Sequence, residues 1–235
     1  MAQAHPEPHT SNHSSKLNWL RASVLGANDG IVSIAGLVVG VAGATDSTQI
    51  IFTAGMAGII AGAISMAAGE YVSVSSSRDT EKALLRKEKY ELEHYPEEEL
   101  KELATIYEHK GLSRKTAMAV AKELSVKDAY AAHVDAELGI DPHNLTNPWH
   151  AALASSVSFL AGAIIPMIAV LVPPVSVRIL FAFAAVLLAL VLTGTISARI
   201  GGAHIRRAVI RVVLGGALAM TVTYGVGKLL GASGI

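Results

Sequence analysis

The segment NWLRASVLGANDGIVSIAGLVVGVAGA, residues 18–44, decides the fold class of this chain. It is an apolar run with a single carboxylate, Asp29, inside it. A helix needs about 20 mainly apolar residues to cross the hydrocarbon core of a bilayer, and this run is long enough. A charge at that depth costs at least ~2.5–3.5 kcal/mol, so such a residue usually faces a bundle interior or a water-filled path. Asp29 is therefore a candidate transport residue. The alternative is an aspartate near a helix end that reaches interfacial water.

The composition extends this interpretation to the whole chain. The 235 residues have a mean hydropathy of +0.45, and 51% are apolar while only 16% are charged. These values indicate a polytopic membrane protein. Of 19 acidic residues, 15 lie between Asp79 and Asp141, so the chain carries one polar, acidic insertion. Because there is no cysteine, disulfides and thiolate metal sites are excluded.

Five apolar segments predict five transmembrane helices in an all-α protein. They cover residues 19–44, 48–75, 149–172, 175–198 and 207–230. Glycines four apart within the first two, such as Gly26 and Gly30, predict close packing of helix backbones. We expect four regions: a disordered tail (residues 1–18), the first two spans (19–77), a helical metal-binding module (78–147) and the last three spans (148–235).

The orientation follows from the positive charges near the spans, because cytoplasmic loops carry the excess of Lys and Arg. An odd number of spans places the termini on opposite sides. The side of the amino terminus and the module carries Lys16, Arg21, Arg78, Arg199, Arg206, Arg207 and Arg211; the other side carries Arg178 and Lys228. We therefore expect a cytoplasmic amino terminus and module, with the carboxyl terminus outside. Nucleic-acid binding is not supported, since the polar module is acidic.

Start and stop signals divide the module into three or four helices. Pro96 followed by three glutamates is typical of a helix start, with acids against the positive end of the helix. Ser113 and the box formed by Ser125 and Asp128 predict two further starts, and Gly139 predicts a stop.

Two glutamate pairs in the module are candidate metal ligands. Glu88 and Glu91 are three residues apart, as are Glu99 and Glu102, so each pair shares a helix face. Apolar residues at helical spacing accompany both pairs. A carboxylate pair on the packing side of a helix requires a cation or a proton.

Further along, His133 and Glu137 lie at positions i and i+4 and could join the same pocket. Carboxylate with imidazole suits Fe(II), Mn(II) or Ca(II). The alternative is an ordinary solvated acidic face, in which Lys87 pairs with Glu91 and the glutamates after Pro96 serve only to start a helix.

Two residues of the second span are weaker candidates. Met66 is the kind of residue that usually fills space between membrane helices, but beside Asp29 its thioether would prefer Fe(II) over Mg(II) or Ca(II). Glu70, one helical turn further on, could relay a proton or pair with Arg78.

Two motifs resemble the vacuolar iron transporter family: ANDGIVS (residues 27–33) in the first span and SMAAGEYVSV (residues 65–74) in the second. The glutamate pairs, the Glu137-Leu138-Gly139 turn and the Asn147-Pro148 entry to the third span also match. The resemblance covers about residues 17–230.

The resemblance implies a homodimer that exports Fe(II), and often Mn(II), from the cytosol in exchange for protons, without catalysis or a resident cofactor. It implies that Asp29 and Met66 line the path. The glutamates that gather metal would be Glu88, Glu91, Glu99, Glu102 and Glu137. Family members often carry methionines before the last glutamate, where this chain has His133-Val134. A chain without cysteine or a long amino-terminal extension resembles the bacterial members, so we expect a bacterial plasma membrane; a vacuolar membrane is the alternative.

Two other functions are open at this point. A membrane-tethered di-iron carboxylate enzyme would need two Glu-x-x-His motifs, and the chain has one, at Glu91 and His94. A metal sensor that does not transport would bind metal through the module, and Asp29 would then have no function.

Overall fold

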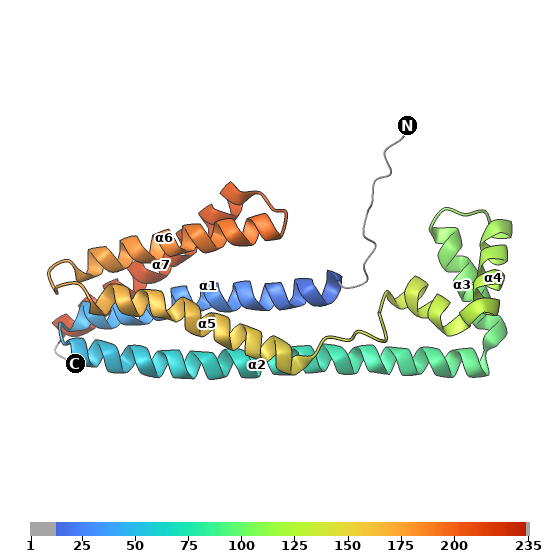
Figure 1. Cartoon of the computed structure of the whole chain (residues 1–235), viewed down its shortest axis with the longest axis horizontal. Helices are drawn as coiled ribbons and strands as arrows, with labels where there is room; N and C mark the ends of the chain where they lie inside the picture. The colour runs from blue at the N-terminus through green and yellow to red at the C-terminus, as the bar shows by residue number, and fades with distance from the viewer. Residues whose placement is uncertain (1–12, 234–235) are drawn as a thin grey trace, which may run out of the picture. The chain divides into compact units, whose positions relative to one another are not determined.

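The computed structural model describes residues 13–233, which form seven α-helices and one π-helical turn and contain no β-strand (Figure 1). The helices are α1 (His13–Ala44), α2 (Thr48–His94), α3 (Pro96–His109), α4 (Arg114–His133), α5 (Pro148–Leu171), α6 (Arg178–Ile200) and α7 (Ile205–Ala232), with η1 (Val134–Leu138) after α4. The predicted all-α class is confirmed. Residues 1–12 of the predicted tail lie outside the described residues. α1 begins within that predicted segment because no proline follows Pro8 until Pro96.

Five helices are long and apolar enough to cross a membrane, in agreement with the five predicted spans. They are α1 from Ala22, α2, α5, α6 and α7. With 47 residues, α2 is about 70 Å long, more than twice the ~30 Å of a bilayer core. Its apolar character ends before Arg78, and a charged segment follows. Only the first part of α2 is therefore apolar enough to span a membrane, and the same helix continues beyond it to His94.

The chain divides into two compact units, to both of which α2 contributes. The first comprises residues 1–72 and 148–235, and the second comprises residues 73–147. In the first unit α1 is the central helix, because it contacts α5, α6 and α7. Its apolar side chains are buried in the core of this unit, which includes Ile31, Ile34, Val38, Val39, Phe159, Val186, Leu190 and Met220.

Glycines allow α1 and α5 to approach at backbone distance. A Cβ atom on Gly26 would overlap the carbonyl oxygen of Ser155, and one on Gly30 would overlap that of Phe159. In the reverse direction, Gly162 of α5 faces the carbonyl oxygen of Ala27. The glycine spacing in the first span thus serves helix packing, as predicted.

Buried polar contacts join other parts of this unit. Arg178, only 4% exposed at the start of α6, donates to the Asp46 carbonyl oxygen (3.2 Å) and to the Thr48 hydroxyl (2.7 Å). It thereby connects α6 to the turn between α1 and α2. Deeper in the unit, the Thr193 hydroxyl donates to the side-chain oxygen of Asn28 at 2.9 Å.

The second unit contains α3, α4 and η1. Its helices begin at the predicted proline and Ser113 signals, whereas the start predicted at Ser125 lies three residues later, at Asp128. Pro96 opens α3 with three glutamates in the first turn, and the Ser113 hydroxyl accepts from the Thr116 amide at the start of α4. The helix restarts at Asp128, whose carboxylate accepts from the Ala131 amide (2.9 Å). Gly139, with φ of +61°, ends η1. Leu103, Ala104 and Ala121 form the small core that packs α3 on α4.

Candidate metal centre

Three of the predicted ligands meet in the second unit. Glu88, Glu99 and His133 are 2%, 6% and 0% exposed, and one ligand atom from each lies within 4.8 Å of the others. His133 Nδ1 lies 3.0 Å from Glu88 Oε1 and 3.5 Å from Glu99 Oε2. Among the described residues this is the one group of three such side chains that converges in this way. We call it the Glu–Glu–His cluster.

Each member reaches the cluster through the packing of its own helix. Glu99 lies one turn before Leu103, the buried residue that fixes α3 against α4, so its carboxylate turns to the same side. On α2, Glu88 lies three residues after the buried Leu85. His133 is the last residue of α4 and follows the restart at Asp128. The three ligands therefore come from three different helices.

The polar atoms of the cluster lack ordinary hydrogen-bond partners. Glu88 Oε1 and both ring nitrogens of His133 are buried without a hydrogen bond. Buried polar atoms are nearly always satisfied, so a group of such atoms facing one another requires an explanation. A divalent cation would supply it, and two carboxylates with one imidazole are the donor set that suits Fe(II) or Mn(II).

Glu137 lies at the edge of the cluster. Its Oε2 is 3.8 Å from His133 Nδ1, and its side chain is 29% exposed. The turn that carries it, η1, is π-helical, which the sequence pattern did not indicate. π-helical turns occur frequently at functional sites because the extra residue per turn redirects side chains. Glu137 thus lies close enough to join the three buried side chains, and it is more accessible than they are.

The electrostatics of the cluster favour retention of a proton when no cation is bound. Burial, followed by the charges of Glu137 and Glu99, raises the pKa of Glu88 from 4.5 to about 7. Burial and then the charge of Glu102 also raise the pKa of Glu99. Because metal ligands must be deprotonated, a cation that enters displaces this proton.

This shift predicts an unusual dependence of stability on pH. Between about pH 4.5 and 7 folded Glu88 holds a proton that the unfolded chain has released, so the metal-free protein should lose up to about 3 kcal/mol as pH rises through this range. Thermal unfolding of the full chain in detergent, with a chelator present and at a series of pH values, measures this loss of stability. The Glu88→Gln variant is the reference, and the difference between the two curves should vanish at the acid end. An equal pH slope in both proteins would contradict the prediction.

Two predicted ligands of the module lie outside the Glu–Glu–His cluster. Glu91 forms an ion pair with Lys87 at 2.8 Å, the alternative noted from the sequence. Glu102 is exposed on α3. The spacing of three correctly put each pair on one helix face, but only the first member of each pair is buried.

The membrane candidates belong to the first unit. Asp29 is partly buried and accepts a hydrogen bond from the Ser33 hydroxyl at 2.7 Å. Met66 is partly buried and packs against the apolar core, and Glu70 is partly buried on the same helix. The sequence reasoning did not assign Asn28, which binds Thr193, or Ser33. The helical spacing of four between Asp29 and Ser33 was a signal that could have found the latter.

Five apolar helices define a multi-pass membrane protein, and the comparisons with known proteins specify which kind. The family model described as the VIT family matches residues 20–228. A vacuolar iron transporter of Acanthamoeba castellanii is 42% identical over 221 residues, covering 92% of this chain and 82% of that protein. Vacuolar iron transporter homolog 1 of Oryza sativa subsp. japonica is 36% identical over 225 residues (95% and 79%). The chain belongs to the VIT family. The relatives are named as transporters, in agreement with the prediction that the chain is not an enzyme.

Proposed function

We propose that this protein is a proton-coupled divalent-metal transporter that moves Fe2+, and Mn2+ as a second substrate, out of the cytosol as a homodimer. The observation that carries the proposal is the buried Glu–Glu–His cluster with unsatisfied ligand atoms, in a multi-pass chain whose relatives are named iron transporters. The metal is the transported substrate and not a resident cofactor.

In this proposal the second unit collects metal on the cytosolic side. The Glu–Glu–His cluster binds the ion, and Glu137 lies at its edge. The acidic residues around it, including Glu91 and Glu102, raise the local cation concentration. The excess of Lys and Arg near the spans supports a cytoplasmic amino terminus and module.

Asp29 and Met66 are proposed to line the path through the membrane. A carboxylate inside an apolar helix is expensive unless it serves a path or a partner, and Asp29 has one short hydrogen bond from Ser33. A thioether beside it would favour Fe(II) over harder cations. Glu70 is proposed to relay protons one turn beyond Met66.

Proton coupling would follow from competition at the carboxylates. Metal entry displaces the proton that the raised pKa of Glu88 retains near neutral pH, and re-protonation favours release. We expect a bacterial plasma membrane, with the carboxyl terminus outside. The relatives are named for a vacuole, and in both membranes the metal would leave the cytosol.

Metal uptake into inside-out vesicles tests the proposal. An acidic vesicle interior should drive uptake of Fe2+ or Mn2+ by the wild-type protein, and Asp29→Asn should reduce the rate by about tenfold or more because the path loses its charged ligand. Asp46→Asn, which removes an exposed carboxylate from the turn between α1 and α2, is the matched control and should transport normally.

Three outcomes would contradict parts of the proposal. Uptake that ignores the pH gradient would exclude antiport. Normal uptake by Asp29→Asn would place the path elsewhere. Metal binding by the purified protein without any vesicle uptake would favour a sensor. The mass of the detergent-solubilised protein, corrected for bound detergent, tests the dimer.

A further inference from the structure

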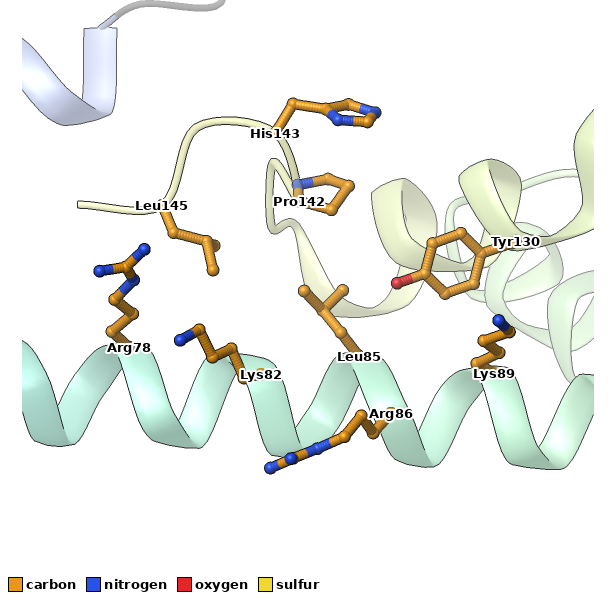
Figure 2. Close-up of a pocket in the computed structure, with 9 residues that line it drawn as sticks. All are labelled: Arg78, Lys82, Leu85, Arg86, Lys89, Tyr130, Pro142, His143 and Leu145. Atoms are coloured by element: carbon orange, nitrogen blue, oxygen red, sulfur yellow. The ribbon is translucent and has the colours of Figure 1, made fainter. Parts of the chain in front are cut away.

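A second polar site, separate from the Glu–Glu–His cluster, lies on the charged segment of α2. It is a pocket of about 520 Å³ within the second unit (Figure 2). Its lining residues are Arg78, Lys82, Leu85, Arg86, Lys89, Tyr130, Pro142, His143 and Leu145. Four of the nine are permanently basic and none is acidic, although the surrounding module is rich in carboxylates. We call it the basic pocket.

The basic side chains are arranged by the helix period. Arg78, Lys82, Leu85 and Lys89 follow the spacing i, i+4, i+7 and i+11, which places them on one face of α2. Figure 2 shows Arg78, Lys82 and Leu85 directed towards the loop that carries Pro142 and Leu145. Lys89 is directed towards Tyr130, and Arg86 runs along the side of the helix. This basic face of α2 therefore forms one side of the pocket, opposite the loop.

The loop after η1 and helix α4 supply the other lining residues of the pocket. The Asp141 side chain accepts from the His143 amide (3.0 Å), and the Asp141 carbonyl oxygen accepts from the Asn144 amide (3.1 Å). These bonds form a tight turn in the loop, and the Asp141 carboxylate has its hydrogen-bond partner within the loop itself. From α4 the hydroxyl of Tyr130 points towards the space between the loop and α2 (Figure 2).

The positive charges of the basic pocket have no carboxylate partner in the described part of the chain. Among the described residues, carboxylates lie within 4.0 Å of Lys87 and His133, and of none of the four basic lining residues. The Nε atom of Arg78 is buried without a hydrogen-bond partner. A concave site that gathers unpaired cationic donors and a buried unsatisfied N–H is complementary to an anion.

We propose that the basic pocket binds a phosphate-bearing anion. Arg78 offers the planar guanidinium that pairs with phosphate oxygens, the lysines add point charges, and Tyr130 adds a neutral donor. The volume lies within the range of small-ligand sites. The ligand is either the headgroup of an anionic lipid or a soluble phosphate, which share this chemistry.

The position on α2 is compatible with a lipid source. Arg78 lies one helical turn after Val74, close to the end of the apolar segment. Clusters of four or more Lys and Arg directly beyond a membrane span are typical of sites for anionic headgroups. The proposal does not depend on transport, because it concerns residues outside the Glu–Glu–His cluster and is tested without metal.

The competing explanation is a diffuse positive flank that only orients the span. A diffuse flank responds to charge alone, so any lysine of the module would contribute equally and Tyr130 would be irrelevant. A pocket with a specific ligand depends on the residues that line it, whether charged or neutral. The two explanations therefore differ in variants that change charge elsewhere or that change a hydroxyl without changing charge.

The experiment measures binding to the metal-free full chain in a nonionic detergent. Pyrophosphate is titrated by calorimetry, and phosphatidylglycerol retention is measured by native mass spectrometry against phosphatidylcholine. The Arg78→Gln/Lys82→Gln double variant should bind the preferred probe about tenfold or more weakly, and Tyr130→Phe several-fold more weakly. The control Lys101→Gln/Lys122→Gln removes two exposed lysines outside the pocket and should leave the affinity unchanged.

Each result decides the proposal. A loss of affinity in the pocket variants but not in the control supports the proposal. The probe that binds, lipid or pyrophosphate, then shows whether the ligand is a lipid headgroup or a soluble phosphate. The proposal is overturned if neither probe binds, if the control variant loses as much affinity as the pocket variant, or if Tyr130→Phe binds as tightly as wild type. Thermal unfolding of Tyr130→Phe, expected to match wild type closely, excludes misfolding as the cause.

Discussion

The His133→Gln variant is expected to bind Mn2+ on the order of a hundredfold more weakly than the wild-type protein. His133 provides the only nitrogen ligand in the Glu–Glu–His cluster, and it is fully buried with neither ring nitrogen in a hydrogen bond. Glutamine keeps a polar side chain of similar length but offers an amide oxygen, which is a weaker ligand for a transition metal than imidazole. Calorimetric titration of Mn2+ into the full chain measures the change.

A matched control comes from the same unit. His94 is exposed at the end of α2 and stacks on Tyr90, and His94→Gln should leave Mn2+ affinity unchanged. The same variant tests the di-iron alternative, since His94 completes the one Glu-x-x-His motif. A large loss in His94→Gln with little change in His133→Gln would contradict the assignment of the cluster.

Thermal unfolding gives an independent measure of the same prediction. A ligand in hundredfold excess over its dissociation constant stabilises the folded state by about 2.7 kcal/mol. Mn2+ should therefore raise the melting temperature of the wild type and of His94→Gln clearly, and that of His133→Gln only slightly, since the same concentration stabilises this variant by about 0.4 kcal/mol. An equal rise in all three proteins would mean that the stabilising ion binds elsewhere.

The second large effect is expected from Gly30→Ala in α1. The added methyl group would overlap the Phe159 carbonyl and approach the Ala163 amide nitrogen to 3.1 Å, and both belong to the backbone of α5. Backbone atoms inside a packed helix cannot move aside as a flexible side chain can. We therefore expect the free energy of unfolding to fall by about 3 kcal/mol, the upper end of the usual range of about 1–3 kcal/mol for overpacking. Fluorescence-detected size-exclusion chromatography after heating measures the lost stability.

Gly69→Ala is the control for this experiment. Gly69 lies in α2 with no atom within 4 Å of a Cβ built on it, so alanine should be neutral or stabilise the helix by about 0.5–1 kcal/mol. The two variants make the same chemical change in two membrane helices, and only the contact with α5 distinguishes them. Equal melting temperatures would show that the contact between α1 and α5 is not tight.

The sequence predicted the helices better than it predicted their partners. Hydropathy located all five spans, and the proline and serine signals located the starts of α3 and α4, because these features depend on residues close together in the chain. The bond between Thr193 and Asn28 joins residues 165 apart, and no local pattern could indicate it.

In the candidate site, too, the local features could be predicted from the sequence and the long-range contacts could not. Helical spacing placed Glu88 with Glu91 and Glu99 with Glu102, but spacing cannot state which member of a pair turns inwards. That choice depends on how each helix is rotated in the folded unit, where Leu103 packs in the core between α3 and α4 and Leu85 is buried on α2. The π-helical form of η1 was also outside the reach of spacing rules, since the step from His133 to Glu137 is compatible with an ordinary helix.

The origin of the three ligands on three separate helices has a consequence for biosynthesis. No stretch shorter than residues 88–133 contains Glu88, Glu99 and His133 together. A growing chain therefore acquires the complete donor set only after α4 has been synthesised and packed on α3. In the proposed function, cation capture is coupled to the folding of the second unit, so a newly made chain that has not folded this unit lacks the assembled donor set.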